Sequence, residues 1–241
     1  MATLLPILMY HQVVPEAEMP FDRHLYVTPE TLTGQILELK RAGFQFVTLR
    51  EAWTRIRDGR GGKAVALTFD DLYDNVVRHA IPVLQEHGVR ATVFAITQTV
   101  GRGEDRRLVV PGLFGVNESS LRDLVDAGLE VGSHTVSHRE LTSLDDRALR
   151  AELSDSRHCL EDMLGVEVTS LCYPRGRFSP RVVRFVEAAG YDCACTTLRG
   201  TLHTEADRWA LRRVRAGEER IGLKLTYALT RWYHWLNLRR A

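Results

Sequence analysis

Short apolar runs of strand length alternate along this chain with longer segments whose apolar residues repeat at helical spacing. Most of the short runs are rich in β-branched or aromatic residues, and glycines or charged residues bound them, as is typical of strands. They predict seven strands, at Leu4–Tyr10, Phe44–Thr48, Ala64–Phe69, Ala91–Ile96, Leu129–Gly132, Thr169–Tyr173 and Tyr191–Thr196.

The segments between these runs predict helices with recognisable ends. Thr28 and Ser179 are each followed by a proline, which suits an N-cap and a first helical turn, and a glycine follows most of the helical segments. Helices are predicted from Thr28 onward and at Asn75–His87, Asn117–Ala127, Leu144–Leu164 and Ser179–Ala189.

The alternation of strands and helices determines the expected fold class. An α/β chain in this order forms a mostly parallel sheet with helices outside it, either as a (β/α) barrel or as a doubly wound sheet. In both architectures, binding and catalytic residues gather at the C-terminal ends of the strands. At 241 residues, one domain over 1–241 is expected, because α/β barrels of this length commonly stay undivided.

Composition narrows the class of partner. The chain has 32 basic and 31 acidic residues, and this near balance gives no reason to expect nucleic acid as a partner. Its four cysteines lack the spacing of a zinc or redox pair and are expected to be buried free thiols. The N-terminus has no basic region before its short apolar run, and no run is long enough to cross a membrane, which favours a cytoplasmic location.

A further helix is predicted near the C-terminus, at about 219–239. Its apolar face contains Leu225, Leu229, Trp232 and Leu236, and Arg231, Arg239 and Arg240 lie off that face. Packing against the domain would explain this pattern. Peripheral contact with a membrane or a partner would also explain it, so both interpretations stay open.

Chemically active side chains follow two of the predicted strands. Asp70 and Asp71 end a buried run as "TFDD", and two crowded carboxylates repel each other unless a cation or proton lies between them. His134 and His138 follow another strand as "SHTVSH", a spacing that lets both imidazoles bind one metal ion. Helix capping would also explain the aspartates, and the histidine pair alone is a weak signal. Because parallel strands end at one edge, all four side chains can meet there.

A third strand ends in "YPRG". Pro174 restricts the conformation of Tyr173, and Gly176 allows a turn in which a backbone N–H can point outward. Such a donor can bind a developing oxyanion. An ordinary turn between a strand and a helix would need the same residues.

Together, "TFDD", "SHTVSH" and "YPRG" resemble the motifs of the polysaccharide deacetylase family, the NodB-homology domains of carbohydrate esterase family four. The motifs occur in order, each at a predicted strand end, and the resemblance spans Leu4 to Arg215. It implies a single distorted (β/α) barrel of seven or eight strands. It also implies removal of N-acetyl groups from amino sugars in glycans, with a divalent metal held by one aspartate and two histidines.

The resemblance implies a role for each matching residue. Asp70 would be the general base, and the metal ligands would be Asp71, His134 and His138. This ligand set suits Zn²⁺, and Co²⁺, Ni²⁺ or Fe²⁺ would be accepted by the same atoms. The backbone N–H of Tyr173 would help to hold the oxyanion.

The leaving amine also needs a proton, and two histidines are candidates for the general acid. Many family members use a histidine in a late "LxH" motif, which here would be His203. In the branch that deacetylates poly-N-acetylglucosamine the order is permuted, and an N-terminal "YH" supplies the acid. The stretch "ILMYHQV" resembles that version, so His11, which ends an apolar strand, is favoured.

The chain also departs from the family pattern. The arginine that many members carry before their third motif is absent, and "LRRVRAG" resembles the arginine segment of the permuted branch, which would make Arg213 the residue that orients Asp70. Arg175 replaces a common aromatic residue and bears on which sugar or anionic group is accepted. The residues expected to contact substrate are Tyr10, Pro174, Arg175 and Gly176.

The expected function is metal-dependent hydrolysis of an N-acetyl amide on a polysaccharide or oligosaccharide. Two alternatives stay open. A cytosolic deacetylase or deformylase of a small or lipid-linked sugar would use the same residues, whereas a non-catalytic glycan-binding module would keep the site without turnover. A binding module has no need of Asp70, which argues against the second alternative.

Overall fold

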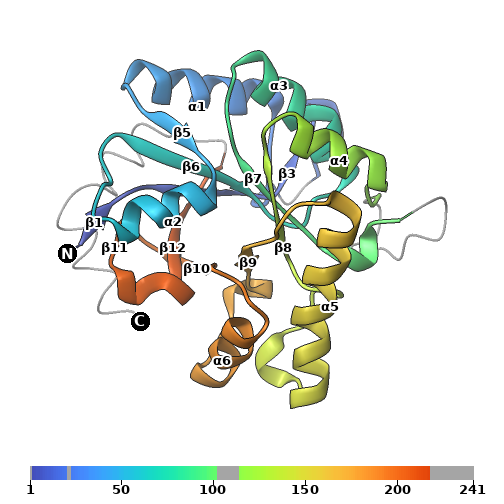
Figure 1. Cartoon of the computed structure of the whole chain (residues 1–241). Helices are drawn as coiled ribbons and strands as arrows, with labels where there is room; N and C mark the ends of the chain where they lie inside the picture. Colours follow the sequence, from blue (N-terminus) through green and yellow to red (C-terminus); the bar gives the residue numbers. More distant parts are fainter. Residues whose placement is uncertain (1, 21–22, 102–113, 218–241) are drawn as a thin grey trace.

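Seven parallel strands close into a barrel in the computed structural model, which describes residues 2–20, 23–101 and 114–217 (Figure 1). In chain order they are β2 (Ile7–Tyr10), β6 (Ala64–Phe69), β7 (Thr92–Ala95), β8 (Glu130–Ser133), β9 (Ser170–Cys172), β10 (Cys193–Arg199) and β12 (Leu211–Arg215). Around the barrel the order is β2, β12, β10, β9, β8, β7 and β6, and the pairing of β2 with β6 closes it. The fold is therefore the expected (β/α) barrel and not a doubly wound sheet.

The barrel is distorted at β6, where an eighth strand joins it. β5 (Gln45–Val47) pairs with the first half of β6, and β7 pairs with the second half. Ala66 pairs with both β2 and β5, and Phe69 pairs with both β2 and β7. β5 and β7 therefore lie one after the other along the same edge of β6.

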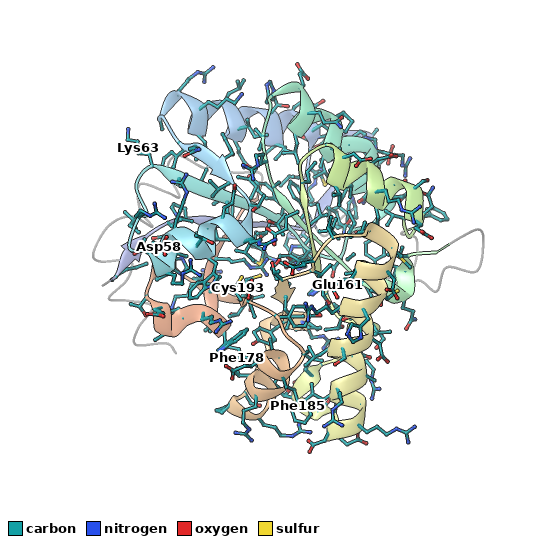
Figure 2. The ribbon with its side chains drawn as sticks, viewed as in Figure 1. Asp58, Lys63, Glu161, Phe178, Phe185 and Cys193 are labelled. Atoms are coloured by element: carbon teal, nitrogen blue, oxygen red, sulfur yellow. The ribbon has the colours of Figure 1, made fainter. Side chains whose placement is uncertain are left out.

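Alternation along the strands separates two apolar cores. Leu8 and Tyr10 belong to the core between the barrel and the helices, whereas Ile7 and Ala66 belong to a second core inside the barrel. Cys193 lies in this inner core and near the middle of the molecule in Figure 2. All four cysteines are free, as expected, and three of them are buried.

The described α-helices are α1 (Pro29–Arg41), α2 (Leu49–Arg57), α3 (Ile81–Glu86), α4 (Glu118–Asp126), α5 (Asp146–Leu164) and α6 (Pro180–Ala188). The side chains of Thr28 and Ser179 cap α1 and α6, as predicted. The predicted helix Asn75–His87 is divided into a π-helical turn, Val76–Ala80, and α3. Pro82 near the start of α3 has no N–H to donate to the preceding turn.

Two of the longer elements were not indicated by the pattern of apolar residues. Helix α2 begins with a capping box made by Thr48 and Glu51, and it packs Trp53 and Ile56 against the inner core at the N-terminal ends of the strands. Strand β12 closes the barrel between β10 and β2. Its inward-facing Arg213 interrupts the apolar alternation by which a strand is recognised.

Short strand pairs flank the first barrel strand. β1 (Thr3–Leu4) pairs with β11 (Leu202–His203), and β3 (Gln12–Val13) pairs with β4 (Tyr26–Val27). His11 is the one residue between β2 and β3. Short 3₁₀ turns occupy Glu16–Glu18, Thr97–Thr99, Leu141–Ser143, Pro174–Gly176 and Glu205–Trp209.

The amphipathic helix expected at about 219–239 lies outside the described residues. Its role therefore stays a prediction, as does the extent of a single domain over 1–241. Among the residues that the structure describes, no helix has both the length and the apolar character needed to cross a membrane.

Candidate active site

The two aspartates that follow β6 lie beside different parts of the site. Asp70 continues the strand, because its N–H donates to the Tyr10 carbonyl at 3.0 Å. Asp71 has a φ of 66°, a left-handed conformation that residues other than glycine seldom adopt. This turn brings the Asp71 carboxylate to the loop that follows β8.

Three metal-ligating atoms meet at that loop. Asp71 Oδ1 lies 3.2 Å from His134 Nε2 and 3.5 Å from His138 Nε2. One carboxylate and two imidazoles form the donor set of a catalytic zinc site, because three protein ligands leave positions open for water and substrate. The ligand atoms all lie within 4.8 Å of one another, so these residues fit a divalent cation.

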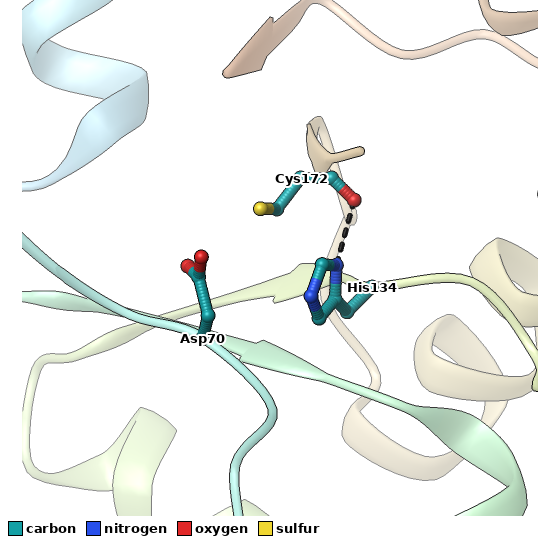
Figure 3. Close-up of side chains that lie close together, drawn as sticks. All are labelled: Asp70, His134 and Cys172. Carbon is teal, nitrogen blue, oxygen red and sulfur yellow. Dashed lines mark hydrogen bonds between the residues drawn. The ribbon is translucent and has the colours of Figure 1, made fainter. Parts of the chain in front are cut away.

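A hydrogen bond fixes the ring of His134. Its Nδ1 lies 2.7 Å from the carbonyl oxygen of Cys172, drawn as a dashed line in Figure 3. A carbonyl only accepts, so Nδ1 carries a proton, and Nε2 is the ring nitrogen that faces Asp71 and would bind a cation. Burial and the nearby His134 lower the pKa of His138 to about 4. His138 is therefore neutral at pH 7, as a metal ligand must be.

Glu152 in α5 holds the loop that carries both histidines. Its carboxylate accepts hydrogen bonds from the backbone N–H groups of Val136, at 3.0 Å, and Ser137, at 2.9 Å, and from the Ser137 hydroxyl. The His138 N–H donates to the Thr135 hydroxyl at 3.1 Å. Glu152 is buried, and hydrogen bonds to a charged group are stronger than neutral ones. The loop is therefore anchored to α5 as well as to the barrel.

Unusual backbone conformations are concentrated in the same segments. Within the described residues, the non-glycine positions with positive φ are Asp71, Thr135, His138 and Arg175. All four lie in the three sequence motifs. Each such position costs on the order of 1 kcal/mol or more and persists only where surrounding contacts enforce it. Functional sites are where such positions usually cluster.

A buried arginine orients Asp70. Nη1 and Nη2 of Arg213 each donate to one Asp70 oxygen at 2.7 Å, and Nε donates to the Thr196 carbonyl at 2.8 Å. Nη1 also donates to the Thr68 hydroxyl at 3.0 Å. Burial alone would raise the pKa of Asp70, but the charge and hydrogen bonds of Arg213 bring it far below its ordinary value. Asp70 is therefore an ionised carboxylate that Arg213 holds in one orientation.

His11 lies in this site, and His203 does not. His11 Nε2 is 3.9 Å from Asp70 Oδ2. Burial lowers the pKa of His11, and the negative charge of Asp70 partly opposes this effect. His203 Nε2 is instead 3.1 Å from the carbonyl of Leu5, at the N-terminal end of β2. Because Asp70 lies at the C-terminal end of β6, His203 is at the opposite end of the barrel.

Tyr10 does not contact the mouth of the barrel, which corrects the expectation for this residue. It is 1% exposed, its hydroxyl donates to Gln35 Oε1 in α1 at 2.8 Å, and its ring stacks on Phe69. Neighbouring residues of a strand face opposite sides, and β2 uses Tyr10 for the outer core. Only His11 of the "YH" pair reaches the site.

The "YPRG" segment is also more structural than expected. The Tyr173 N–H donates to the Cys195 carbonyl at 3.2 Å, so it does not point outward, and this geometry is against the expected role as oxyanion donor. A Cβ on Gly176 would lie 2.1 Å from Thr197 Oγ1, which explains why glycine is needed there. Pro174 is buried, and Arg175 is exposed. Of the four residues expected to contact substrate, Arg175 has the most accessible side chain.

A cavity of about 320 Å³ lies beside His11. It is lined by Met9, His11, Leu25, Thr197, Arg199, Arg213 and Arg215. This volume is at the lower end of the range for small-molecule sites. The site therefore has room for a ligand beside His11, the candidate general acid.

A family model for polysaccharide deacetylase matches residues 57–194, which is more than half of the chain. The chain belongs to the polysaccharide deacetylase family. The match includes the segments with Asp70, Asp71, His134 and His138. As a polysaccharide deacetylase it is a hydrolase that acts on carbon–nitrogen bonds other than peptide bonds.

Individual deacetylases resemble the chain over most of its length. YxkH of Bacillus subtilis, whose name places it in this family, is 29% identical over 213 residues, covering 88% of this chain and 71% of that protein. The poly-β-1,6-N-acetyl-D-glucosamine N-deacetylase of Staphylococcus epidermidis is 25% identical over 198 residues, covering 78% of this chain and 67% of that one. The deacetylase PplD of Streptococcus pyogenes, solved with acetate, has a TM-score of 0.82 at 23% identity, covering 95% of this chain and 100% of that one, which shows the shared fold.

Some residues of this polysaccharide deacetylase site were missed by the sequence motifs. Glu152 is an acid on the buried face of a long amphipathic helix, and that position was the only signal for it. Arg215 follows Arg213 by two residues and so shares its face of β12, as the strand period implies. Arg199 is the last residue of β10, the longest of the barrel strands. Its place at the C-terminal end of a strand was the only sign that it lies at the mouth of the barrel.

Proposed function

We propose that this protein removes N-acetyl groups from N-acetylated amino sugars in a polysaccharide or oligosaccharide, with one divalent cation, most readily Zn²⁺. The position of Asp70 and His11 is the observation that carries the proposal. Amide hydrolysis needs a base for the attacking water and an acid for the leaving amine. Here an oriented carboxylate and an imidazole lie 3.9 Å apart beside a three-ligand metal site.

The cation would be held by Asp71, His134 and His138. When bound, it would supply the charge that polarises the acetamide carbonyl and lowers the pKa of the attacking water. Glu152 and the Cys172 carbonyl keep the two imidazoles in place before any ligand arrives. The ligands are therefore preorganised by hydrogen bonds to two different elements.

Asp70 takes the proton of the attacking water. Each of its oxygens accepts one hydrogen bond from Arg213, and each retains a second lone pair for this proton. Arg213 keeps the carboxylate ionised, so the base is in its active form at neutral pH. Because the guanidinium is planar and bidentate, it also fixes the direction in which the carboxylate faces.

His11 gives a proton to the nitrogen of the sugar as the amide bond breaks. Burial lowers the pKa of His11, and before the reaction the negative charge of Asp70 opposes this effect by favouring the protonated imidazole. Once Asp70 has accepted a proton from water, that charge is lost and His11 becomes a stronger acid. Because Asp70 and His11 lie close together, transfer of a proton from water to Asp70 therefore promotes transfer of a proton from His11 to the sugar nitrogen.

The nature of the saccharide is the least constrained part of the proposal. The similarity to the Staphylococcus epidermidis enzyme supports a poly-β-1,6-N-acetylglucosamine chain as a candidate substrate. The same catalytic groups would also act on a short or lipid-linked N-acylated sugar. A panel that contains the polymer, chitooligosaccharides and lipid-linked N-acetylglucosamine distinguishes these substrates.

The test is acetate release from this panel by zinc-loaded protein and by Asp70→Asn. We expect wild-type protein to release acetate from at least one substrate. Asp70→Asn should bind zinc with the same stoichiometry as the wild type. It should release acetate at least about 100-fold more slowly, as loss of a general base implies. Comparable turnover by Asp70→Asn would exclude it as the base. No acetate from any substrate would leave a non-catalytic glycan-binding role as the better explanation.

A further inference from the structure

Cys172, the last residue of β9, contacts both halves of the site through different atoms. Its sulfur accepts a hydrogen bond from Nη2 of Arg213 at 3.3 Å. Its backbone carbonyl accepts one from His134 Nδ1 at 2.7 Å. In Figure 3 the sulfur extends toward the side of Asp70 and the carbonyl oxygen toward His134. The side chain therefore contacts the arginine that orients the base, and the backbone contacts a candidate metal ligand.

The sulfur of Cys172 satisfies the last donor of a fully buried guanidinium. An arginine side chain has five N–H groups. In Arg213, two of them donate to Asp70 and one to the Thr196 carbonyl. A fourth donates to the Thr68 hydroxyl, which leaves one N–H on Nη2 for the sulfur. Because the Arg213 side chain is fully buried, bulk water does not reach this N–H in place of the sulfur.

Loss of this acceptor would disturb the orientation of Asp70. A buried donor without a partner is costly, and a planar guanidinium regains a partner only if the whole group turns or shifts. Both Nη atoms of Arg213 hold Asp70, so any such movement displaces the carboxylate as well. The sulfur therefore favours the one position of Arg213 in which both of its bonds to Asp70 are 2.7 Å long.

We infer that Cys172 is a positioning residue for the deacetylation, because its sulfur holds Arg213 in the position that orients Asp70. This inference rests on the proposed function and adds a residue to the group that prepares the base. Cys172 is not among the described residues that line the cavity beside His11. Its sulfur is therefore expected to affect kcat and to leave KM unchanged.

The test compares Cys172→Ala with Cys172→Ser in zinc-loaded protein, with the saccharide of the panel that the wild type hydrolyses fastest. The two replacements are similar in size, but only serine has an oxygen that accepts the Arg213 N–H. We expect Cys172→Ala to lower kcat for acetate release by about tenfold or more with KM unchanged, as a small misplacement of a catalytic group does. Cys172→Ser should restore most of the lost kcat.

Zinc affinity separates this role from a general disturbance of the site. The carbonyl of Cys172 belongs to the backbone and is present in both variants, so His134 keeps its hydrogen bond. We therefore expect zinc affinity, measured by competitive chelator titration, to equal that of the wild type in both variants. A loss of zinc affinity that parallels the loss of kcat would assign the effect to the metal ligands and reject the role of the sulfur.

Cys193→Ala is the matched control for loss of a thiol from the inner core. Cys193 is as buried as Cys172, and both belong to that core. It pairs with Ser170, two residues before Cys172 in β9, and so lies farther from the mouth of the barrel. In the part of the chain that the structure describes, its sulfur makes no hydrogen bond. Cys193→Ala should lower the melting temperature as Cys172→Ala does, but it should keep the wild-type kcat.

A double-mutant cycle shows whether the sulfur acts through Arg213. Arg213→Met lacks the N–H that the sulfur accepts, so Cys172→Ala should change kcat far less in that background than in the wild type. An equal loss of kcat in both backgrounds would overturn the inference and leave the deacetylase function intact. The same conclusion follows if Cys172→Ala keeps the wild-type kcat, or if Cys172→Ser loses as much activity as Cys172→Ala.

Failure of the proposed function gives a different result. In that case the wild type releases no acetate from any saccharide of the panel, and urea unfolding of the four proteins of the cycle tests the contact itself. Losses of stability that are not additive support the contact by which Cys172 holds Arg213, and additive losses reject it.

Discussion

Replacement of Arg213 by Met should destabilise the protein strongly, because it leaves the Asp70 carboxylate buried without its cation. The side chain of Arg213 is fully buried and that of Asp70 is 4% exposed, so solvent does little to compensate the loss. Removal of one partner from a buried ion pair costs about 3–5 kcal/mol. In a chain of this size each kcal/mol lowers the melting temperature by roughly 2–4 °C. A fall of about 6–20 °C is therefore expected.

A double-mutant cycle isolates the ion pair from the other bonds of Arg213. Arg213→Met also removes the donors to the Thr196 carbonyl and the Thr68 hydroxyl, and the double variant Asp70→Asn/Arg213→Met removes the same donors. Their loss therefore cancels in the cycle, and the remaining coupling free energy belongs to the charged pair.

Urea denaturation of the wild type, both single variants and the double variant, followed by far-UV circular dichroism, gives these free energies of unfolding. We expect the double variant to be more stable than Arg213→Met, by about 1–3 kcal/mol, because no unpaired charge remains. Arg212→Met, on the opposite face of β12, controls for loss of a long side chain. If the two single effects simply add, the ion pair does not have the role assigned to it.

Further predictions concern the acid, the metal ligands and the loop that carries them. His11→Ala should retain zinc and lose acetate release, whereas His203→Ala should keep the wild-type kcat in folded protein; the opposite result would reassign the acid. Asp71→Ala should lose zinc, measured by inductively coupled plasma mass spectrometry, and full occupancy would exclude Asp71 as a ligand. Glu152→Gln should weaken zinc affinity by about 10–100-fold, as loss of an outer-shell partner does. Unchanged affinity in a competitive chelator titration would show that Glu152 does not position the loop.

Much of the fold was predictable because most barrel strands are apolar runs with clear boundaries. Ala64–Phe69 was predicted to the residue, since it is buried on both faces and ends abruptly at two acids. β12 was not predictable in this way, because its inward-facing Arg213 is neutralised by Asp70 from a strand 143 residues away. A charge whose partner is distant in sequence looks solvent-exposed until the fold brings the pair together.

The site was predictable where a motif specifies the side chains. It was less predictable where the backbone conformation determines which way a side chain or an N–H group points. The expected grouping of Asp71, His134 and His138 follows from residue type and strand ends. The wrong expectation for Tyr10 has a simple cause, since one step along a strand turns a side chain to the other face. The Tyr173 N–H illustrates the same limit, because sequence does not show which carbonyl it bonds.

The most direct test of the proposed mechanism is a titration of metal-free protein with Zn²⁺. During the titration we measure acetate release from an N-acetylated saccharide that the zinc-loaded protein hydrolyses. The proposal predicts that activity rises linearly and reaches its plateau at one zinc ion per chain. His134→Ala, titrated in parallel, should remain inactive at that ratio. Full activity of the metal-free protein, or full activity of His134→Ala at one equivalent of zinc, would contradict a metal-dependent deacetylase centred on Asp71, His134 and His138.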